Sequence, residues 1–234
     1  GIAIGIVLLP ELSRTLINKN INEGQNAFNR ALEFSLLLTI PSAIALIIIP
    51  VSLISVLFER GMFTKTDSIS TAHALAIYGL GLPAFVLQKV LQPLYFARED
   101  TKSPFRFAIF AMILNVSLAI ILSFYFGFLS AAIGTTVSSW AMIFLLWSGC
   151  RGMGQATKID FRLKKNLPLI IASSILMGII IYLVQLILIN NLNAPNIRYF
   201  SLFILIFSGI ISYIFFINLF GVISKKDIRK FIKK

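Results

Sequence analysis

Residues 105–150 read FRFAIFAMILNVSLAIILSFYFGFLSAAIGTTVSSWAMIFLLWSGC, and this stretch decides the fold class of the chain. It holds two apolar runs, 105–126 and 128–150, which are separated by a tight turn near Gly127. Each run reaches the roughly 20 residues that an α-helix needs to cross a hydrocarbon layer about 30 Å thick. We therefore predict two transmembrane helices joined by a very short connection.

Other apolar runs extend this pattern along the whole chain. Four more candidate spans are predicted, at about 31–58, 72–96, 167–189 and 198–222. Their apolar residues are continuous rather than alternating, and backbone groups in lipid must be paired within the segment, so helices are favoured over a barrel. A run at 1–12 is too short to cross a membrane, and we interpret it as the end of a truncated helix from a longer protein. The prediction is one all-α polytopic membrane unit, residues 1–234, with one partial and six full transmembrane helices.

The composition agrees with a membrane protein. Of the 234 residues, 58% are hydrophobic and only 13% are charged, which is too little polar surface to cover a soluble globule. Cys150 is the single cysteine, so an internal disulfide is excluded, and no spaced Cys and His pairs are available to hold zinc. We therefore expect no metal site and no cofactor.

The basic residues indicate an orientation. If the C-terminus is cytoplasmic, 17 of the 21 Lys and Arg residues fall on the inner side, and only Arg60, Lys65 and Arg198 fall on the outer side. The positive-inside rule therefore predicts a cytoplasmic C-terminus. The net charge of +12 then needs no nucleic acid as a partner, because a basic tail such as Lys225–Lys234 beside a membrane faces anionic lipid headgroups. The expected partner is the lipid bilayer.

Lys89 is the one basic residue that lies well inside a predicted span rather than at its end or in a loop, with Gln88 beside it and Gln92 one helical turn away. An ionisable group in a span costs about 2.5–3.5 kcal/mol, so by default it faces a protein interior or a water-filled cavity. The alternative is that the long side chain snorkels to the interface about seven residues away. The two glutamines favour the cavity, so we take Lys89, Gln88 and Gln92 as candidate cavity residues.

Prolines interrupt several predicted spans, at Pro41, Pro50, Pro83 and Pro93. Each proline removes a backbone N–H and permits a kink. Bent and broken helices are typical of transporter sites, although kinking prolines also occur in static membrane proteins.

Neutral polar residues give a weaker signal. Asn115 and Thr135 are candidate ligands for a monovalent cation, but bonding between helices is the simpler interpretation because no carboxylate stands near them. Glu33 lies one turn from Arg30, which predicts an ion pair at the interface.

The carboxylates argue against an enzyme. Glu99 and Asp100 are adjacent in one short loop, and consecutive helical positions do not share a face, so they are unsuited to act as an acid–base pair.

Three stretches resemble motifs of the bacterial lipid II flippases of the MviN/MurJ type, which belong to the multidrug/oligosaccharidyl-lipid/polysaccharide (MOP) exporter superfamily. They are GIAIGIVLLPELS at 1–13, PSA at 41–43 followed by LFERGMF at 57–63, and KVLQPLYFAREDTKSP at 89–104. The last is the most specific, because it joins a membrane lysine, a kink and a charged loop at fixed spacing. Beyond residue 151 the resemblance rests on hydropathy and length.

The resemblance implies an architecture and partners. Such flippases have fourteen spans with both termini cytoplasmic, so this chain would run from the end of the eighth span to the fourteenth, as the C-terminal lobe in the bacterial inner membrane. Its partners would be the missing N-terminal lobe and a polyprenyl-pyrophosphate-linked peptidoglycan precursor. The family's cavity arginines lie outside this chain.

The resemblance also implies roles for residues. Lys89 would be a cation of the central cavity, and the last two spans would line a lateral groove for the lipid tail. The inner loop after Lys89 would position or gate the cavity. Its candidate residues are Tyr95, Arg98, Asp100, Lys102 and Pro104.

The expected function is flipping of lipid II by alternating access, with no bond made or broken and with no transport by this half alone. Three alternatives remain open. One is another carrier of the superfamily, such as a polysaccharide-lipid flippase or a drug exporter. The second is a non-transporting scaffold made from half a flippase, and a membrane glycosyltransferase is the least favoured.

Overall fold

The computed structural model describes residue 10 and residues 21–154, 157–194 and 197–222. Over these ranges the regular elements are helical, and no strand occurs within them. The helix end predicted at 1–12, apart from Pro10, and the basic tail at 225–234 lie outside the described residues.

Six of the described helices are long and apolar enough to cross a membrane. In chain order the elements are α2 (Ile21–Ile48), α3 (Pro50–Phe58), α4 (Lys65–Phe96), α5 (Lys102–Phe126), α6 (Leu129–Cys150), the 3-10 turn η1 (Arg151–Met153), α7 (Phe161–Asn193) and α8 (Arg198–Leu219). The prediction of an all-α protein with six long apolar helices is confirmed.

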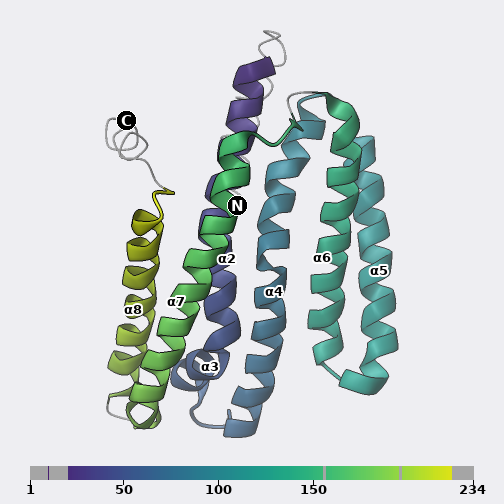
Figure 1. The fold of residues 1–234 in the computed structure, drawn as a ribbon. Coiled ribbons are helices and arrows are strands. Elements are labelled where there is room, and N and C mark those ends of the chain that lie inside the picture. Colours follow the sequence, from purple (N-terminus) through teal and green to yellow (C-terminus); the bar gives the residue numbers. More distant parts are fainter. Residues whose placement is uncertain (1–9, 11–20, 155–156, 195–196, 223–234) are drawn as a thin grey trace.

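The long helices stand side by side and, in chain order, run alternately down and up, so that the neighbours α4 and α6 are parallel, as are α2 and α7 (Figure 1). Each packs on its neighbours in the order α5, α6, α4, α2, α7 and α8, and the short helix α3 contacts α4 and α8. One end of the bundle therefore carries the start of α2, the α4–α5 and α6–α7 connections and the end of α8. The predicted inner-side basic residues among those described gather at this end, which we call the basic end.

The range predicted as one span, 31–58, is divided in the structure. Pro50 occupies the first position of α3, and Ile49 before it has a non-helical conformation (φ −116°, ψ 33°). Proline has no N–H to continue the ladder and its ring clashes with the preceding turn, so the helix breaks there. Pro41 lies inside α2, and Pro83 and Pro93 lie inside α4, without ending those helices.

Four helices, α2, α4, α5 and α7, begin earlier than the apolar pattern predicts, and in α4 and α7 polar caps account for the extension. The Thr64 hydroxyl accepts from the N–H of Asp67, and the Asp67 carboxylate accepts from the N–H of Thr64, so α4 starts at Lys65. The Asp160 carboxylate accepts from the N–H of Leu163 at 2.7 Å and caps α7. Side-chain acceptors of this kind satisfy the otherwise unpaired first N–H groups of a helix.

Two of the three apolar cores found among the described residues lie on either side of α2. The first joins α2, α4 and α6 around Phe28, Leu91, Tyr95 and Leu146. The second joins α3, α7 and α8 around residues such as Val56 and Leu205. Because Phe28, Ala31 and Leu32 of α2 belong to the first core and Ile44, Ala45 and Ile48 of the same helix pack against the second, α2 forms the shared wall of the bundle.

Candidate functional site

The three candidate cavity residues share α4 but differ in their surroundings. Gln88 is half-buried and donates from its Nε2 to the backbone oxygen of Ser139 on α6, at 3.1 Å. Lys89 is exposed, and no carboxylate of the described residues lies within 4 Å of it. Gln92 is half-buried one turn further on. The structure thus leaves the Lys89 charge available to a ligand or to another segment.

Two more side chains join α4 to α6 by hydrogen bonds to backbone oxygens. Thr136 Oγ1 donates to Ile77 at 2.9 Å, and Trp140 Nε1 donates to Leu80 at 3.1 Å. Polar side chains commonly link membrane helices in this way. With Gln88, they hold the helix that carries Lys89 in place along much of its length.

The predicted inner loop is anchored to the end of α6. Tyr95 is fully buried and donates from its hydroxyl to the Leu146 backbone oxygen at 2.6 Å. A Cβ atom on Gly149 would lie 2.3 Å from that hydroxyl, so only glycine leaves room for the ring. Arg98 donates to the Met153 backbone oxygen in η1. Both side chains therefore position the loop against α6.

The remaining loop residues form the start of α5. Asp100 accepts from the backbone N–H of Ser103 at 3.0 Å. Hydrogen bonds from Ser103 hold the pKa of the Asp100 carboxyl below its usual value, so its contribution to stability is lost only as the pH falls through that lowered pKa. Lys102 is exposed, and Pro104 is buried in the first turn of α5, where a missing N–H costs nothing.

Asn115 and Thr135 lie on neighbouring helices, α5 and α6. Gly134 lets the two helices approach closely, because a Cβ atom there would lie 2.9 Å from both the backbone and the side-chain oxygen of Asn115. The Thr135 hydroxyl donates to the Ala131 backbone oxygen of its own helix at 2.8 Å. Within the described part of the chain, no group of three His, Cys, Asp or Glu residues could hold a metal ion.

One further feature of the described residues was not predicted residue by residue from the sequence. It is an apolar groove of about 610 Å³ with walls from α2 and α3 on one side and α8 on the other, and with α7 as its floor. Pro41, Ala45 and Ile49 line one wall, and Ile210 lines the other. The break at Ile49 therefore lies in the wall of the groove.

Polar contacts fix the walls of the groove relative to each other. The Tyr213 hydroxyl of α8 donates to the Leu37 backbone oxygen of α2 at 2.5 Å. On the floor side, Gln185 of α7 donates to the hydroxyl of Ser52 in α3 at 2.8 Å. Both residues are ordinary neutral side chains in the sequence, and only their contacts mark them as functional candidates.

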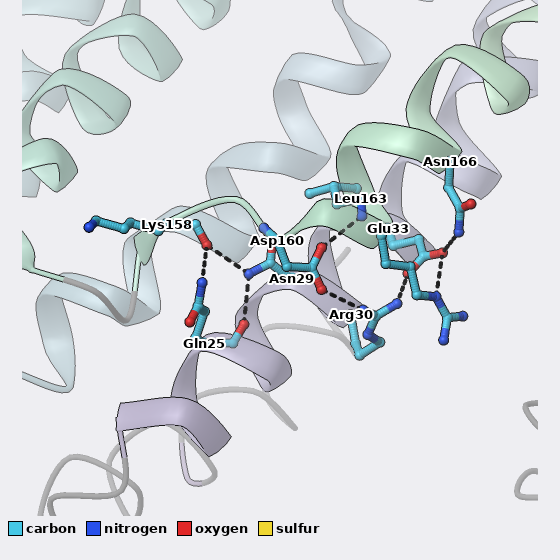
Figure 2. A network of polar contacts seen from close by, with 9 residues as sticks. Gln25, Asn29, Arg30, Glu33, Lys158, Asp160, Leu163 and Asn166 are labelled. Carbon is cyan, nitrogen blue, oxygen red and sulfur yellow. Dashed lines mark hydrogen bonds and ion pairs between the residues drawn. The ribbon is translucent and has the colours of Figure 1, made fainter.

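A larger polar network joins α2 to α7 at the basic end (Figure 2). Glu33 is 4% exposed and is paired with Arg30, as predicted from their spacing. It also accepts from Arg162 at 3.4 Å and from Asn166. Arg30 makes a second ion pair with Asp160 at 2.6 Å.

Asn29 completes the network through the backbone. Its amide donates to the Lys158 oxygen at 2.9 Å and accepts from the Asp160 N–H at 3.0 Å. Gln25 donates to the same Lys158 oxygen at 3.0 Å. The spacing of Arg30 and Glu33 in the sequence predicts their ion pair. Their other partners, Asp160 and Asn166, lie about 130 residues away along the chain, so local spacing could not predict them.

The fold and the groove together define a polytopic membrane protein whose helices frame an apolar groove. Residues 1–208 match the family described as Lipid II flippase MurJ, and the chain belongs to that family. The family resemblance drawn from the three motifs is confirmed. The chain is accordingly a multi-pass inner-membrane protein of a transporter family.

Individual relatives agree with this assignment. The chain is 40% identical over 183 residues to the probable lipid II flippase MurJ of Rhizobium tropici, over 78% of this chain and 34% of that protein. It is 34% identical over 148 residues to the probable lipid II flippase MurJ of Rickettsia prowazekii, over 63% and 29%. A solved structure of lipid II flippase MurJ in an inward closed conformation matches with a TM-score of 0.75 and 27% identity, over 93% of this chain and 42% of that one. The chain thus spans about a third of the length of these curated relatives.

We expect Glu33→Gln to lower the thermal midpoint of the detergent-purified chain. The substitution leaves buried Asn166 and the partly exposed Arg30 and Arg162 facing a neutral amide, and a lost hydrogen bond to a charged group costs about 1.5–3 kcal/mol. The measurement is thermal unfolding followed by circular dichroism. Glu23→Gln is the matched control, because Glu23 lies in the exposed first turn of the same helix. Equal midpoints for the two variants would show that the network does not stabilise the α2–α7 contact.

Proposed function

We propose that this chain is the C-terminal lobe of a lipid II flippase, which moves a polyprenyl-pyrophosphate-linked peptidoglycan precursor across the bacterial inner membrane by alternating access. The observation that carries the proposal is the apolar groove between α2, α3 and α8, on a chain that belongs to the MurJ family. The relatives and the solved structure are named as lipid II flippases. The lobe makes and breaks no bond in this proposal.

The groove suits a polyprenyl tail because it holds the tail by shape. Lipid tails are as apolar as leucine, so a tail gains no hydrophobic free energy by leaving the bilayer for the groove. What it gains is packing against fixed walls, at about 0.1–0.2 kcal/mol for each atom pair. A tail held only by many small contacts remains free to slide while its headgroup crosses.

The headgroup requires cations and polar groups. In the proposal Lys89 faces the central cavity as a phosphate ligand, with Gln88 and Gln92 beside it. Its exposure, the lack of a carboxylate within 4 Å among the described residues and the fixed position of α4 against α6 support this role. A cation bound to phosphate oxygens makes hydrogen bonds roughly twice as strong as neutral ones.

The inner loop would position the ends of α4 and α5 as the cavity opens and closes. The anchoring of Tyr95 and Arg98 to α6 supports a positioning role. Asp100, Lys102 and Pro104 would set the start of α5. Asn115 and Thr135 remain candidate ligands for a cation that would be coupled to transport. The Thr135 hydroxyl already donates to a backbone oxygen of its own helix, which favours a packing role for this residue.

The proposed orientation places the basic end in the cytoplasm, and with it the C-terminus. Basic loops are retained on the cytoplasmic side during insertion. In this orientation the outer side carries Arg60, Lys65 and Arg198 among the described residues. The cavity needs a second wall, which in the proposal is the N-terminal lobe of the whole flippase.

A growth assay tests the proposal. The chain is expressed alone, or fused behind the N-terminal part of the Rhizobium tropici relative in place of the matched segment, in cells depleted of their own flippase. We expect growth with the fusion and none with the chain alone. A fusion that reaches the membrane in normal amounts but fails to support growth contradicts the flippase assignment, and growth with the chain alone contradicts the need for a second lobe.

Blocking the groove should stop transport in the fusion. Ser42 is an exposed residue of the groove wall, and Ser42→Trp would place a bulky ring where the tail is proposed to lie. We expect the rate at which the precursor appears at the outer leaflet to fall at least about tenfold, a barrier increase of about 1.4 kcal/mol. Ser117→Trp on the exposed face of α5 is the control. An unchanged rate for Ser42→Trp would remove the groove from the transport route.

Lys89 should matter through its charge. Lys89→Ala is expected to weaken precursor binding by the fusion roughly 10- to 100-fold, since a hydrogen bond to a charged group contributes about 1.5–3 kcal/mol. Lys89→Arg should retain most of the binding, and Lys65→Ala, at the opposite end of α4, should change nothing. If Lys89→Ala binds and transports normally, the lysine serves only as an interfacial residue.

A further inference from the structure

A second cavity lies at the basic end, between α2, the end of α6 and the connection from α6 to α7. Its volume is about 320 Å³. The buried side chains of Phe28 and Cys150, with the half-buried Trp147, give it an apolar lining. The exposed side chains of Arg151 and Lys158 line it as well. It therefore combines an apolar interior with two cations.

Hydrogen bonds fix the backbone around this cavity. The Thr157 hydroxyl lies 3.0 Å from the Cys150 backbone oxygen and 3.1 Å from that of Gly154, and it donates to these acceptors. The Lys158 oxygen accepts from two side-chain amides of α2, those of Gln25 and Asn29. Figure 2 shows the Lys158 side chain pointing away from these amides. The main chain is thus held by the network while the ammonium group is left outside it.

The two cations have no carboxylate partner in the described part of the chain. The three ion pairs found there involve Arg30 and Arg162 as the basic members. Asp160, two residues from Lys158, already accepts from Arg30 and from the N–H of Leu163. Arg151 also complements the carbonyl end of α6, but Lys158 has no such role. Two like charges beside one apolar cavity favour an anionic ligand.

The position of the cavity selects the kind of anion. It lies where α6 leaves the apolar region, and Trp and Tyr side chains prefer that depth in a membrane. Basic pockets between helices at the membrane surface bind the headgroups of anionic lipids. A soluble anion would gain nothing from the aromatic lining, whereas a lipid brings both a phosphate and an acyl chain.

We propose that this cavity binds an anionic phospholipid of the adjacent leaflet, with the phosphate between Arg151 and Lys158 and an acyl chain against Trp147 and Phe28. The site is separate from the groove and does not depend on which cargo the groove carries. Its occupant ties α6 to α2 at the end where the Glu33 network ties α2 to α7.

Fluorescence of Trp147 tests this site directly, because the chain has only two tryptophans. Trp140→Phe leaves Trp147 as the single reporter in the 234-residue chain purified in neutral detergent. Phosphatidylglycerol or phosphatidylcholine with brominated acyl chains is then titrated into the micelles as quencher. We expect phosphatidylglycerol to quench at a roughly 10- to 30-fold lower mole fraction, since each of the two basic residues near the headgroup contributes about a fivefold factor or slightly less.

The control variants remove the same charge from different places. Arg151→Ala with Lys158→Ala should abolish the preference for phosphatidylglycerol. Lys164→Ala with Lys165→Ala, two exposed charges at the start of α7, should preserve it. Thermal midpoints measured without added lipid separate any loss of the capping effect of Arg151 from the loss of lipid binding.

Three outcomes would overturn the proposal. Equal quenching by the two lipids would mean that the cavity does not recognise charge. An equal loss of preference in both double variants would mean that the whole basic end attracts lipid without a site. Reversal of the quenching by inorganic phosphate alone would mean that the cations bind a soluble anion.

Discussion

Every backbone N–H and C=O in the bilayer must find a partner within the protein, and the junction of α2 and α3 is where this chain departs furthest from a regular helix. Pro50 supplies no N–H, yet the ladder resumes at once, with the Leu53 N–H donating to Ile49 at 3.1 Å and the Ile49 N–H to Ala45 at 3.0 Å. Ile49 is only 2% exposed, so the interruption is covered by protein. The redirected α3 reaches α8 and closes one wall of the groove. The groove thus exists because a helix break is tolerated where neighbouring helices shield it.

At the basic end, the Glu33 network provides partners for a buried charged side chain. A buried carboxylate is costly unless it is paired and hydrogen-bonded, and Glu33 has two arginines and an amide around it. These partners come from both α2 and α7, so their alignment requires the two helices to meet in one register. The groove shares α2 and α7 with the network, so the packing of these two helices restrains both.

The sequence predicts the helices well because membrane thickness translates directly into the length of an apolar run. It does not predict which proline breaks a helix, since Pro41 and Pro83 satisfy the same local rule as Pro50 but are accommodated by their neighbours. The motif at 89–104 identifies Lys89 and the loop after it as candidates, because the charge and the spacing of residues can be read directly from the sequence. The groove is built from common apolar residues on four helices, and Asp160 and Asn166 reach Glu33 only through the fold. Such sites depend on which helices become neighbours, and periodicity carries no information about that choice.

The turn between α5 and α6 has a consequence for how the protein is made. Gly127 adopts φ 55° and ψ −129°, a conformation that only glycine enters readily, and just two residues separate the helices. Two residues span about 7 Å at most, so the start of α6 must stay close to the end of α5. Apart from its extensive contact with α6, α5 makes little contact with the rest of the bundle, and the most apolar part of α5 has no buried residue. We therefore expect the two helices to enter the bilayer as one hairpin, in which α6 provides most of the contact with α4.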